Sequence, residues 1–297
     1  MKQIAIIGPT ASGKSDLALQ IAQKTDAYIL SIDSLSIYKE IDIIAAKPSK
    51  KELDTVKHFG IDILAPNDYF SVDIFIKIYQ EALALSLQEK KNLIIVGGTS
   101  FYLKSLMQGL SELPPITPQI TSDVAQLLLD LPQAHELLAK EDPQTMASIT
   151  PNDRYRIEKM LLIYMGSQMA PSKWFALHPP KPIIHELPIY NIEVARDILR
   201  ERITKRTQKM LALGAIDEVC QLERKYSRTP NAMGSIGIVE ILEYLDGKVS
   251  FDAMAQNITT HTAQLAKRQQ TFNRTQFSSL TSAPLEDLYE IIMTRSF

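Results

Sequence analysis

Eight consecutive residues near the N-terminus have the types and spacing needed to hold a chain of phosphate groups. They stand between an apolar run and a helical pattern, and they match G-x-x-x-x-G-K-[ST], the pattern of a phosphate-binding P-loop. The residues are Gly8, Pro9, Thr10, Ala11, Ser12, Gly13, Lys14 and Ser15. The glycines let the backbone curl so that its N–H groups face a di- or triphosphate, and the helix that follows adds its positive end. Lys14 supplies a mobile cation and Ser15 a hydroxyl ligand for Mg²⁺, so the chain is predicted to bind a polyphosphate.

Two polar residues, Asp33 and Thr99, directly follow other runs with strand character. Ligands of an open parallel sheet bind beyond the carboxyl ends of its strands, so both side chains are expected near the phosphate site. Asp33 could accept a proton or hold Mg²⁺ through water, although its position alone fits a helix cap equally well. Thr99 follows two glycines and could donate a hydrogen bond to a bridging phosphate oxygen. Taken alone, however, Gly-Gly-Thr is a common strand-to-helix turn.

The elements that must position these residues alternate between strand and helix patterns over residues 1–110, which predicts a parallel sheet with crossover helices. The expected strands are residues 3–7, 27–31, 61–64, 92–96 and 185–192, and the expected early helices are residues 13–24 and 72–89. Proline-rich breaks near residues 113–118 and 179–182 enclose a stretch with a wholly helical pattern. The predicted fold is therefore α/β: a P-loop core with a helical insertion and a helical C-terminal part. The expected boundaries are 1–116, 117–172 and 173–297.

Composition describes an ordinary globular chain and excludes several classes of protein. Of 297 residues, 45% are hydrophobic and 22% charged, and the net charge of −2 allows a nucleic-acid surface only as a local patch. The single cysteine, Cys220, rules out an internal disulfide and argues against a zinc cluster. The sequence has no signal-peptide pattern and no run long enough to span a membrane, so a cytoplasmic location is expected.

The P-loop is followed by a series of short motifs whose order is distinctive. They are Asp33-Ser34…Tyr38…Asp42…Ala46-Lys47-Pro48, Gly97-Gly98-Thr99…Tyr102, Asp142-Pro143, Pro151-Asn152-Asp153-Arg154-Tyr155-Arg156-Ile157, Glu201-Arg202-Ile203…Arg206…Met210, Ile236-Gly237 and Ala266-Lys267-Arg268-Gln269…Thr271. With these motifs in this order, nearly the whole chain resembles the tRNA dimethylallyltransferases, also called tRNA isopentenyltransferases.

That resemblance implies transfer of a dimethylallyl group from dimethylallyl diphosphate to the exocyclic amine of the adenosine 3′ of a tRNA anticodon. The P-loop would then hold the prenyl diphosphate, and not ATP. By similarity, Asp33 would accept the amine proton and Thr99 would bond to the bridging oxygen. Arg202 would stabilise the departing diphosphate together with Mg²⁺ on Ser15, and Arg206, one helical turn on, is the second candidate for that role.

The resemblance also implies that the adenine is flipped out of the anticodon stem-loop, and that the insertion clamps this loop. A monomer without membrane contact is expected. The residues expected to contact tRNA are Asp33, Ser34, Leu35, Ser36, Thr99, Thr121, Tyr155, Arg156, Ile157, Glu158, Lys159, Gly237, Lys267, Arg268, Gln269 and Arg274. The sequence departs from the family pattern in this group. Thr121 stands where an arginine is usual, and in the segment 262–272 one cation and two aromatic groups of the family pattern are weakened or lost.

Two other functions are open to a P-loop chain. A nucleoside or nucleotide kinase would need an arginine-rich lid, but the insertion has few arginines besides Arg154 and Arg156. An RNA-binding module without transferase activity would not need all four of Lys14, Ser15, Asp33 and Thr99. The sequence therefore favours the transferase.

Overall fold

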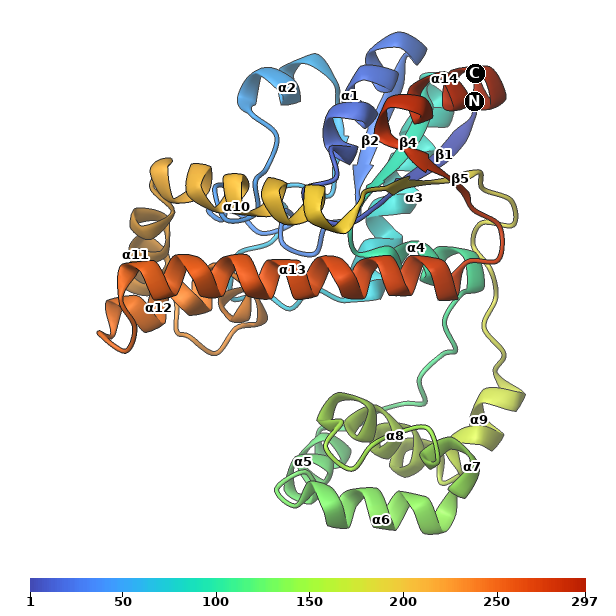
Figure 1. Cartoon of the computed structure of the whole chain (residues 1–297). Helices are drawn as coiled ribbons and strands as arrows, with labels where there is room; N and C mark the ends of the chain where they lie inside the picture. The colour runs from blue at the N-terminus through green and yellow to red at the C-terminus, as the bar shows by residue number, and fades with distance from the viewer. The chain divides into compact units, whose positions relative to one another are not determined.

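The computed structural model describes all 297 residues, which form two compact units (Figure 1). The core unit comprises residues 1–106 and 186–297, and the insertion unit comprises residues 107–185. The insertion unit is wider than the expected 117–172 because the segments on both sides pack with it. For example, the Trp174 indole N–H donates a hydrogen bond to the Glu112 carbonyl oxygen at 2.7 Å.

The core unit is built on a six-stranded, fully parallel sheet in the order β3-β2-β4-β1-β5-β6. The strands are β1 (Gln3–Ile7), β2 (Ala27–Ser31), β3 (His58–Phe59), β4 (Asn92–Gly97), β5 (Ile189–Glu193) and β6 (Thr281–Pro284). β1 and β4 pair in register, with Ile4 beside Ile94 and Ile6 beside Val96. The central strands are apolar at nearly every position because helices cover both faces of the sheet.

The predicted strand at residues 61–64 is wrong, because pairing with β2 stops at Phe59. Gly60 turns the chain there with a φ of 80°, and a Cβ on it would lie 2.7 Å from the Ser31 carbonyl oxygen. The following apolar residues therefore leave the sheet, and only an isolated bridge joins Leu64 to Tyr38. β6 was not predicted, since its sequence Thr-Ser-Ala-Pro carries no hydrophobic alternation.

Helices α1 (Lys14–Thr25) and α14 (Leu285–Ser296) cover one face of the sheet together. Helix α3 (Val72–Gln88) packs on the opposite face, where the Tyr79 hydroxyl donates to Gln3 Oε1 at 3.0 Å. Gln3 and Ile4 point to opposite faces because side chains alternate along a strand, and Ile4 belongs to the cluster beneath α1.

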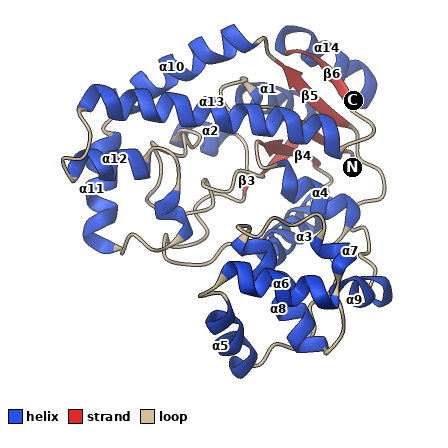
Figure 2. Cartoon of the chain, turned by 60° about the horizontal axis from the view of Figure 1, so that its bottom comes forward, coloured by secondary structure: helices blue, strands red, loops and turns tan.

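The rest of the core unit is helical, and two long helices, α10 (Arg196–Ala212) and α13 (Phe251–Gln276), lie side by side across it (Figures 1 and 2). Leu199 and Ile203 of α10 and Ala266 of α13 form a small buried cluster, against which Ala11 of the P-loop packs. The two helices are thus anchored beside the phosphate site. The remaining elements are α2 (Lys50–Thr55), α4 (Ser100–Gln108), α11 (Ala215–Lys225), η1 (Asn231–Gly234) and α12 (Ile238–Leu245).

The insertion unit is all helical, as predicted, and has a hydrophobic core of its own. Its helices are α5 (Pro118–Leu127), α6 (Leu131–Glu141), α7 (Pro143–Met146), α8 (Arg154–Ser167) and α9 (Pro171–Leu177). Buried Asp142 joins two of them, because its carboxylate accepts hydrogen bonds from the Thr145 amide of α7 at 3.1 Å and the Ser172 amide of α9 at 2.6 Å. None of the chain's helices combines the length and apolar character required to cross a bilayer.

Candidate active site

The P-loop has the backbone that its sequence predicts. Ala11 and Gly13 have φ values of 62° and 90°, and α1 begins directly afterwards at Lys14. A Cβ on Gly13 would lie 2.7 Å from Leu285 Cδ2, so the loop requires glycine at this position. The Lys14 ammonium reaches back over the loop and donates to the Pro9 carbonyl oxygen at 3.3 Å. A phosphate chain placed here would meet both the helix N-terminus and a cation.

Two adjoining cavities lie beside the P-loop, with volumes of about 300 and 800 Å³. Six residues line both of them, namely Thr10, Lys14, Asp33, Ala45, Arg206 and Met210. The smaller cavity adds Thr99 and Ser34, and the larger adds Ser15 and Ser36. We call the two together the central chamber. It brings the predicted phosphate loop, Asp33 and Thr99 to one place, as expected from the strand ends.

Asp33 uses one carboxylate oxygen to hold the turn that follows β2. Its Oδ1 accepts hydrogen bonds from the amides of Leu35 at 2.9 Å and Ser36 at 3.3 Å. The residues after Asp33 form turns and not a helix, so the helix-cap alternative does not apply. No hydrogen bond engages Oδ2, and Asp33 interacts electrostatically with Lys14 and Arg206. One oxygen of Asp33 therefore stays available for chemistry in the chamber.

Thr99 reaches the turn that Asp33 holds. Its Oγ1 accepts the Ser34 amide N–H at 3.3 Å and lies 3.4 Å from the Ser34 hydroxyl. The close approach depends on Gly97, because a Cβ there would lie 2.8 Å from Ile32 Cγ1 and 2.9 Å from the Ile32 carbonyl carbon. The glycine thus lets the ends of β2 and β4 come together, with Asp33 and Thr99 beside each other.

Two cations face Asp33 across the chamber. Burial lowers the pKa of Lys14 from 10.5 to about 8, with Asp33 acting in the opposite direction and Arg206 adding to the decrease. Burial also lowers the pKa of Arg206, again against the effect of Asp33. Both cations lack a hydrogen-bonded carboxylate partner. An anion in the chamber would restore the charge of Lys14 and gain from both groups.

The structure places the two candidate arginines differently from the prediction. Arg206, the second candidate, is half-buried and lines the central chamber, whereas Arg202 is exposed and does not line it. The Arg202 guanidinium contacts the P-loop from outside, donating to the Ser12 carbonyl oxygen at 3.4 Å. The reason is helical geometry, because residues four apart on α10 follow each other along the helix and reach different depths of the core unit.

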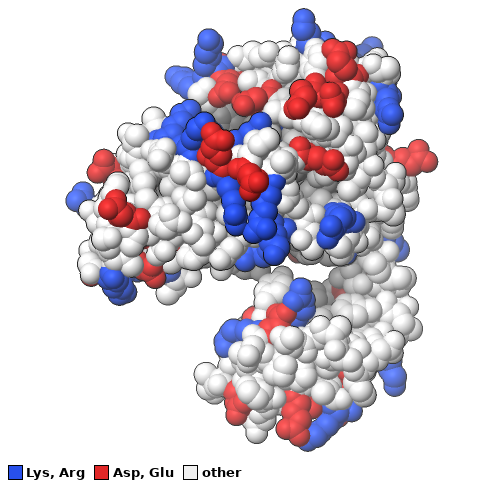
Figure 3. Space-filling model, in the orientation of Figure 1, with Lys and Arg blue, Asp and Glu red and all other residues white.

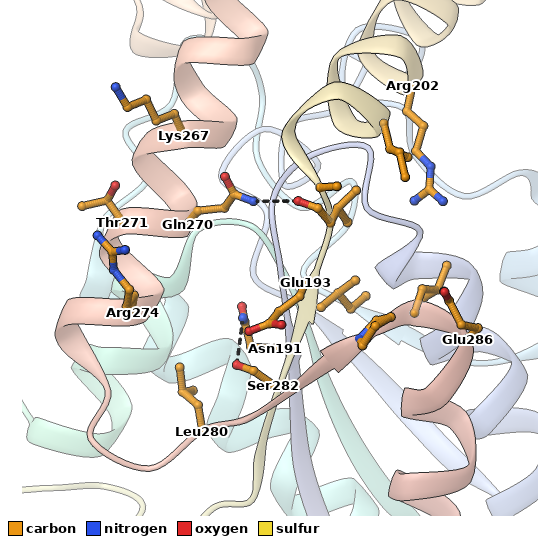
Figure 4. Close-up of a pocket in the computed structure, with 16 residues that line it drawn as sticks. Asn191, Glu193, Arg202, Lys267, Gln270, Thr271, Arg274, Leu280, Ser282 and Glu286 are labelled. Atoms are coloured by element: carbon orange, nitrogen blue, oxygen red, sulfur yellow. Dashed lines mark hydrogen bonds between the residues drawn. The ribbon is translucent and has the colours of Figure 1, made fainter.

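Arg202 instead lines a separate cavity of about 880 Å³, which shares no lining residue with the central chamber (Figure 4). Lys267 and Arg274 of α13 line it from the opposite side, Glu193 lies between these cations and Arg202, and Glu286 also lines the cavity. We call this cavity the outer pocket. None of its three cations forms an ion pair, so it can receive an anion of its own.

Gln269 was predicted to contact tRNA, but its side chain lies against the P-loop. Its Oε1 accepts the Thr10 amide N–H at 2.8 Å, and its amide nitrogen fills the space where a Cβ on Gly98 would stand. Gln269 also lines the central chamber. Its placement ties α13 to two of the loops that surround the phosphate site.

The other residues of the C-terminal part that were predicted to contact tRNA divide into two groups. Lys267, Arg268 and Arg274 are exposed, and Lys and Arg side chains gather over the region of α10 and α13 in Figure 3. Gly237 is buried, and a Cβ on it would lie 3.1 Å from Ile44 Cδ1. Gly237 therefore supports the chamber wall and offers no surface to an RNA.

The predicted tRNA contacts of the insertion unit are also mixed. Tyr155 and Arg156 are exposed in the first turn of α8, Glu158 and Lys159 are half-buried, and Thr121 is exposed on α5. Ile157 does not fit the prediction, because its side chain is 0% exposed in the core of the insertion unit. Ile157 packs α8 into the core of the insertion unit, while its neighbours Tyr155 and Arg156 on the same helix stay exposed.

The donor set suits Mg²⁺ only together with a phosphate ligand. Ser15 is exposed at the start of α1 and lines the larger cavity with Asp16 and Asp33, while no group of three or more His, Cys, Asp or Glu residues could hold a metal ion alone. Mg²⁺ characteristically keeps several waters and binds through phosphate oxygens and one or two protein oxygens. The residues present therefore fit a magnesium–diphosphate complex with the Ser15 hydroxyl as a ligand.

One residue beside the chamber was not predicted from the sequence at all. Glu218, in the first turn of α11, accepts hydrogen bonds from the backbone amides of residues 42–44, a segment that lines the chamber. An acidic residue in the first turn of a helix is so common that the sequence offers no signal for this contact.

Comparison with known proteins agrees with this arrangement. The family model described as IPP transferase matches residues 36–276. A tRNA dimethylallyltransferase of Sulfurimonas denitrificans is 63% identical over 294 residues, covering 99% of each chain. A tRNA dimethylallyltransferase of a Sulfurovum species is 51% identical, covering 99% of this chain and 98% of the relative.

Solved structures of similar proteins share the fold. A eukaryotic dimethylallyltransferase acting on tRNA superposes with a TM-score of 0.83 at 25% identity, covering 98% of this chain and 76% of that one. The tRNA isopentenylpyrophosphate transferase of Bacillus halodurans superposes with a TM-score of 0.72 at 26% identity, covering 99% of this chain and 94% of that one.

Proposed function

The chain belongs to the IPP transferase family, and from this premise we propose that it transfers the dimethylallyl group of dimethylallyl diphosphate to an adenine of tRNA. Transfer of a dimethylallyl group to tRNA is the activity named for its full-length relatives. The observation that carries the proposal is the central chamber, in which Lys14, Asp33 and Thr99 line one cavity beside the P-loop. The donor, the target base and the residue roles are those that the family resemblance implies, and the cavity is compatible with them.

The diphosphate end of the donor is proposed to lie in the P-loop. Backbone N–H groups, the Lys14 ammonium and the Arg206 guanidinium would surround the charge that grows as the C–O bond breaks. Mg²⁺ held by the Ser15 hydroxyl and the phosphates would neutralise part of that charge. The Thr99 hydroxyl, which has only weak contacts to Ser34, is free to turn toward the bridging oxygen.

The adenine amine is proposed to attack from the side of Asp33. The bond between the amine nitrogen and the first carbon of the dimethylallyl group forms while the bond between that carbon and the diphosphate breaks. The amine proton passes to Asp33, whose Oδ1 is held by the amides of Leu35 and Ser36 and whose Oδ2 is free. The turn thus orients the carboxylate before the base arrives, and positioning of this kind is worth about 7–11 kcal/mol in well-oriented systems.

The adenosine 3′ of the anticodon is the proposed target, flipped out of its loop to reach the chamber. The exposed cations Lys267, Arg268 and Arg274 are proposed to bind backbone phosphates. In the insertion unit, Tyr155 and Arg156 are proposed to contact the anticodon stem-loop. A tRNA substrate also agrees with the expected cytoplasmic location and does not require more than one copy of the chain.

The test is incubation of the protein with labelled dimethylallyl diphosphate, Mg²⁺ and unmodified tRNA, with and without ATP. We expect label in the RNA at the same rate in both reactions, and no turnover of ATP. Hydrolysis of ATP that depends on tRNA, with no label in the RNA, would contradict the proposal and favour a kinase.

A further inference from the structure

We propose that Glu218 is a positioning residue for the transfer reaction, because it fixes one wall of the central chamber from outside. The inference rests on the proposed function, since it concerns the same chamber. It names a residue that neither lines the chamber nor touches the P-loop. The wall in question is the segment 42–46, which contributes residues to both cavities of the chamber.

The Glu218 carboxylate is the meeting point of three consecutive backbone amides. Its Oε2 accepts the N–H groups of Asp42 and Ile43, each at 2.8 Å, and its Oε1 accepts that of Ile44 at 3.0 Å. Hydrogen bonds to an ionised acceptor are about twice as strong as neutral ones, and three that converge on one group fix the direction of the backbone. A neutral side chain of the same size cannot replace them, because an amide has only one acceptor oxygen.

The segment has one other strong anchor, Lys47, and its own backbone closes a turn, because the amides of Ala46 and Lys47 donate to the carbonyl oxygens of Ile43 and Asp42 at 3.1 and 3.0 Å. The Lys47 side chain is 4% exposed, and its ammonium donates to the Tyr38 carbonyl oxygen at 2.6 Å and to the carboxylates of Asp42 and Asp62 at 2.6 and 2.5 Å. Between the two anchors the chain is neither helix nor strand, and Ala46 has a φ of 48°. Without Glu218, the amides of residues 42–44 would lose their protein partner, and no hydrogen bond would join this stretch to α11.

The side chains that the segment presents to the smaller cavity are apolar. Ile44 and Ala45 line the smaller cavity together with Asp33, Thr99 and Met210. An apolar wall beside the reacting groups is the surface that a dimethylallyl group needs, since its hydrocarbon part gains from leaving water. By holding this wall, Glu218 would set both the affinity for the prenyl donor and the length of prenyl chain that fits.

The experiment compares Glu218→Ala and Glu218→Gln with Asp217→Asn, a matched control. Asp217 is the exposed neighbour in the same first helical turn and makes none of the three hydrogen bonds. Hydrogen exchange of the peptide covering residues 40–48 reports whether the wall is held. Steady-state kinetics with dimethylallyl and geranyl diphosphates, at a temperature well below the melting point of each variant, report whether the reaction depends on it.

We expect faster exchange in residues 40–48 for both Glu218 variants, with the sheet peptides unchanged. The KM for dimethylallyl diphosphate should rise about tenfold or more in Glu218→Ala and less in Glu218→Gln, since displacements near 1 Å can cost about 10²-fold. The preference for the dimethylallyl over the geranyl donor should weaken in the same order. Asp217→Asn should match the wild type in every measurement.

Two results would overturn the inference. Unchanged exchange in residues 40–48 would show that Glu218 does not hold the wall. Faster exchange with KM and donor preference equal to those of Asp217→Asn would show that the wall does not position the reaction. Should Glu218→Ala fail to fold, Glu218→Gln, which retains one acceptor oxygen, gives the same two readings. Failure of the wild type to transfer label would refute the proposed function separately, while the exchange measurement would still decide whether Glu218 holds the segment.

Discussion

Replacing Arg206 should damage the chemical step, whereas replacing Arg202 should not. Arg206 is half-buried in the central chamber and acts electrostatically on both Lys14 and Asp33. Arg202 is exposed, lies outside the chamber and makes one long hydrogen bond of 3.4 Å to the P-loop backbone. The two residues are four apart on the same helix, so they form a matched pair in which only the surroundings differ.

The expected magnitude follows from the role of Arg206 as a donor to developing charge. Removal of one such donor typically costs about 2.7–4 kcal/mol of transition-state stabilisation, or about 10²–10³ in rate. Water can partly screen and replace an exposed group, so Arg202→Ala should change the rate of the bound complex by less than about threefold. Arg206→Lys should recover only part of the rate, because an ammonium lacks the planar set of donors.

The assay is a single turnover with tRNA and labelled dimethylallyl diphosphate already bound, which separates the chemical step from binding. A melting curve for each variant checks that the core unit is intact. The reasoning is refuted if Arg202→Ala lowers the single-turnover rate by two orders of magnitude while Arg206→Ala leaves it near that of the wild type.

Three further predictions concern binding and stability. Burial holds the pKa of Lys14 at about 8 in the free protein, and a bound diphosphate needs the charge of Lys14. The KM for the prenyl donor should therefore be flat below about pH 7.5 and rise by up to about tenfold per pH unit above pH 8. A pH series of KM tests this, and a flat profile up to about pH 9.5 would contradict it. If Lys267 and Arg274 bind RNA phosphates in the outer pocket, the Lys267→Ala/Arg274→Ala variant should reduce the slope of log affinity against log salt by about 0.7–0.9 per lost contact, as measured by filter binding. An unchanged slope would show that this face is merely solvated. Asp142→Asn should destabilise the insertion unit by about 1–3 kcal/mol, because the single oxygen of an amide cannot replace the two carboxylate oxygens that accept from the Thr145 and Ser172 amides. Chemical denaturation measures this, and unchanged stability would refute the role of Asp142.

Much of the core unit could be predicted because local pattern and tertiary structure agree there. β1 and β2 have the predicted bounds, since runs of buried apolar residues between turn residues permit few alternatives. The convergence of Lys14, Asp33 and Thr99 on one chamber also followed from the sequence, because the strand ends of a parallel sheet lie at one edge.

Features that depend on contacts distant in sequence could not be predicted. The expected strand at residues 61–64 failed because Gly60 must turn against the Ser31 carbonyl oxygen, which only the folded sheet reveals. The sequence ranked Arg202 before Arg206, whereas Arg206 is the one that lines the chamber, because a spacing of four does not tell which residue lies deeper. Ile157 was expected at an RNA surface because the segment 155–159 resembles a tRNA-contacting helix of the family, yet its side chain packs in the core of the insertion unit.

The single-turnover rate of Asp33→Asn tests the central claim, that Asp33 takes the proton from the adenine amine in this chamber. The asparagine oxygen can still accept from the amides of Leu35 and Ser36, so the turn after β2 should survive and the melting temperature should not change. The amide cannot accept a proton, and loss of general-base assistance typically costs about 10²–10⁴ in rate. The account predicts a fall of this size with tRNA bound and near-normal affinity for dimethylallyl diphosphate. A single-turnover rate close to that of the wild type would contradict the account and limit the role of Asp33 to holding the turn after β2.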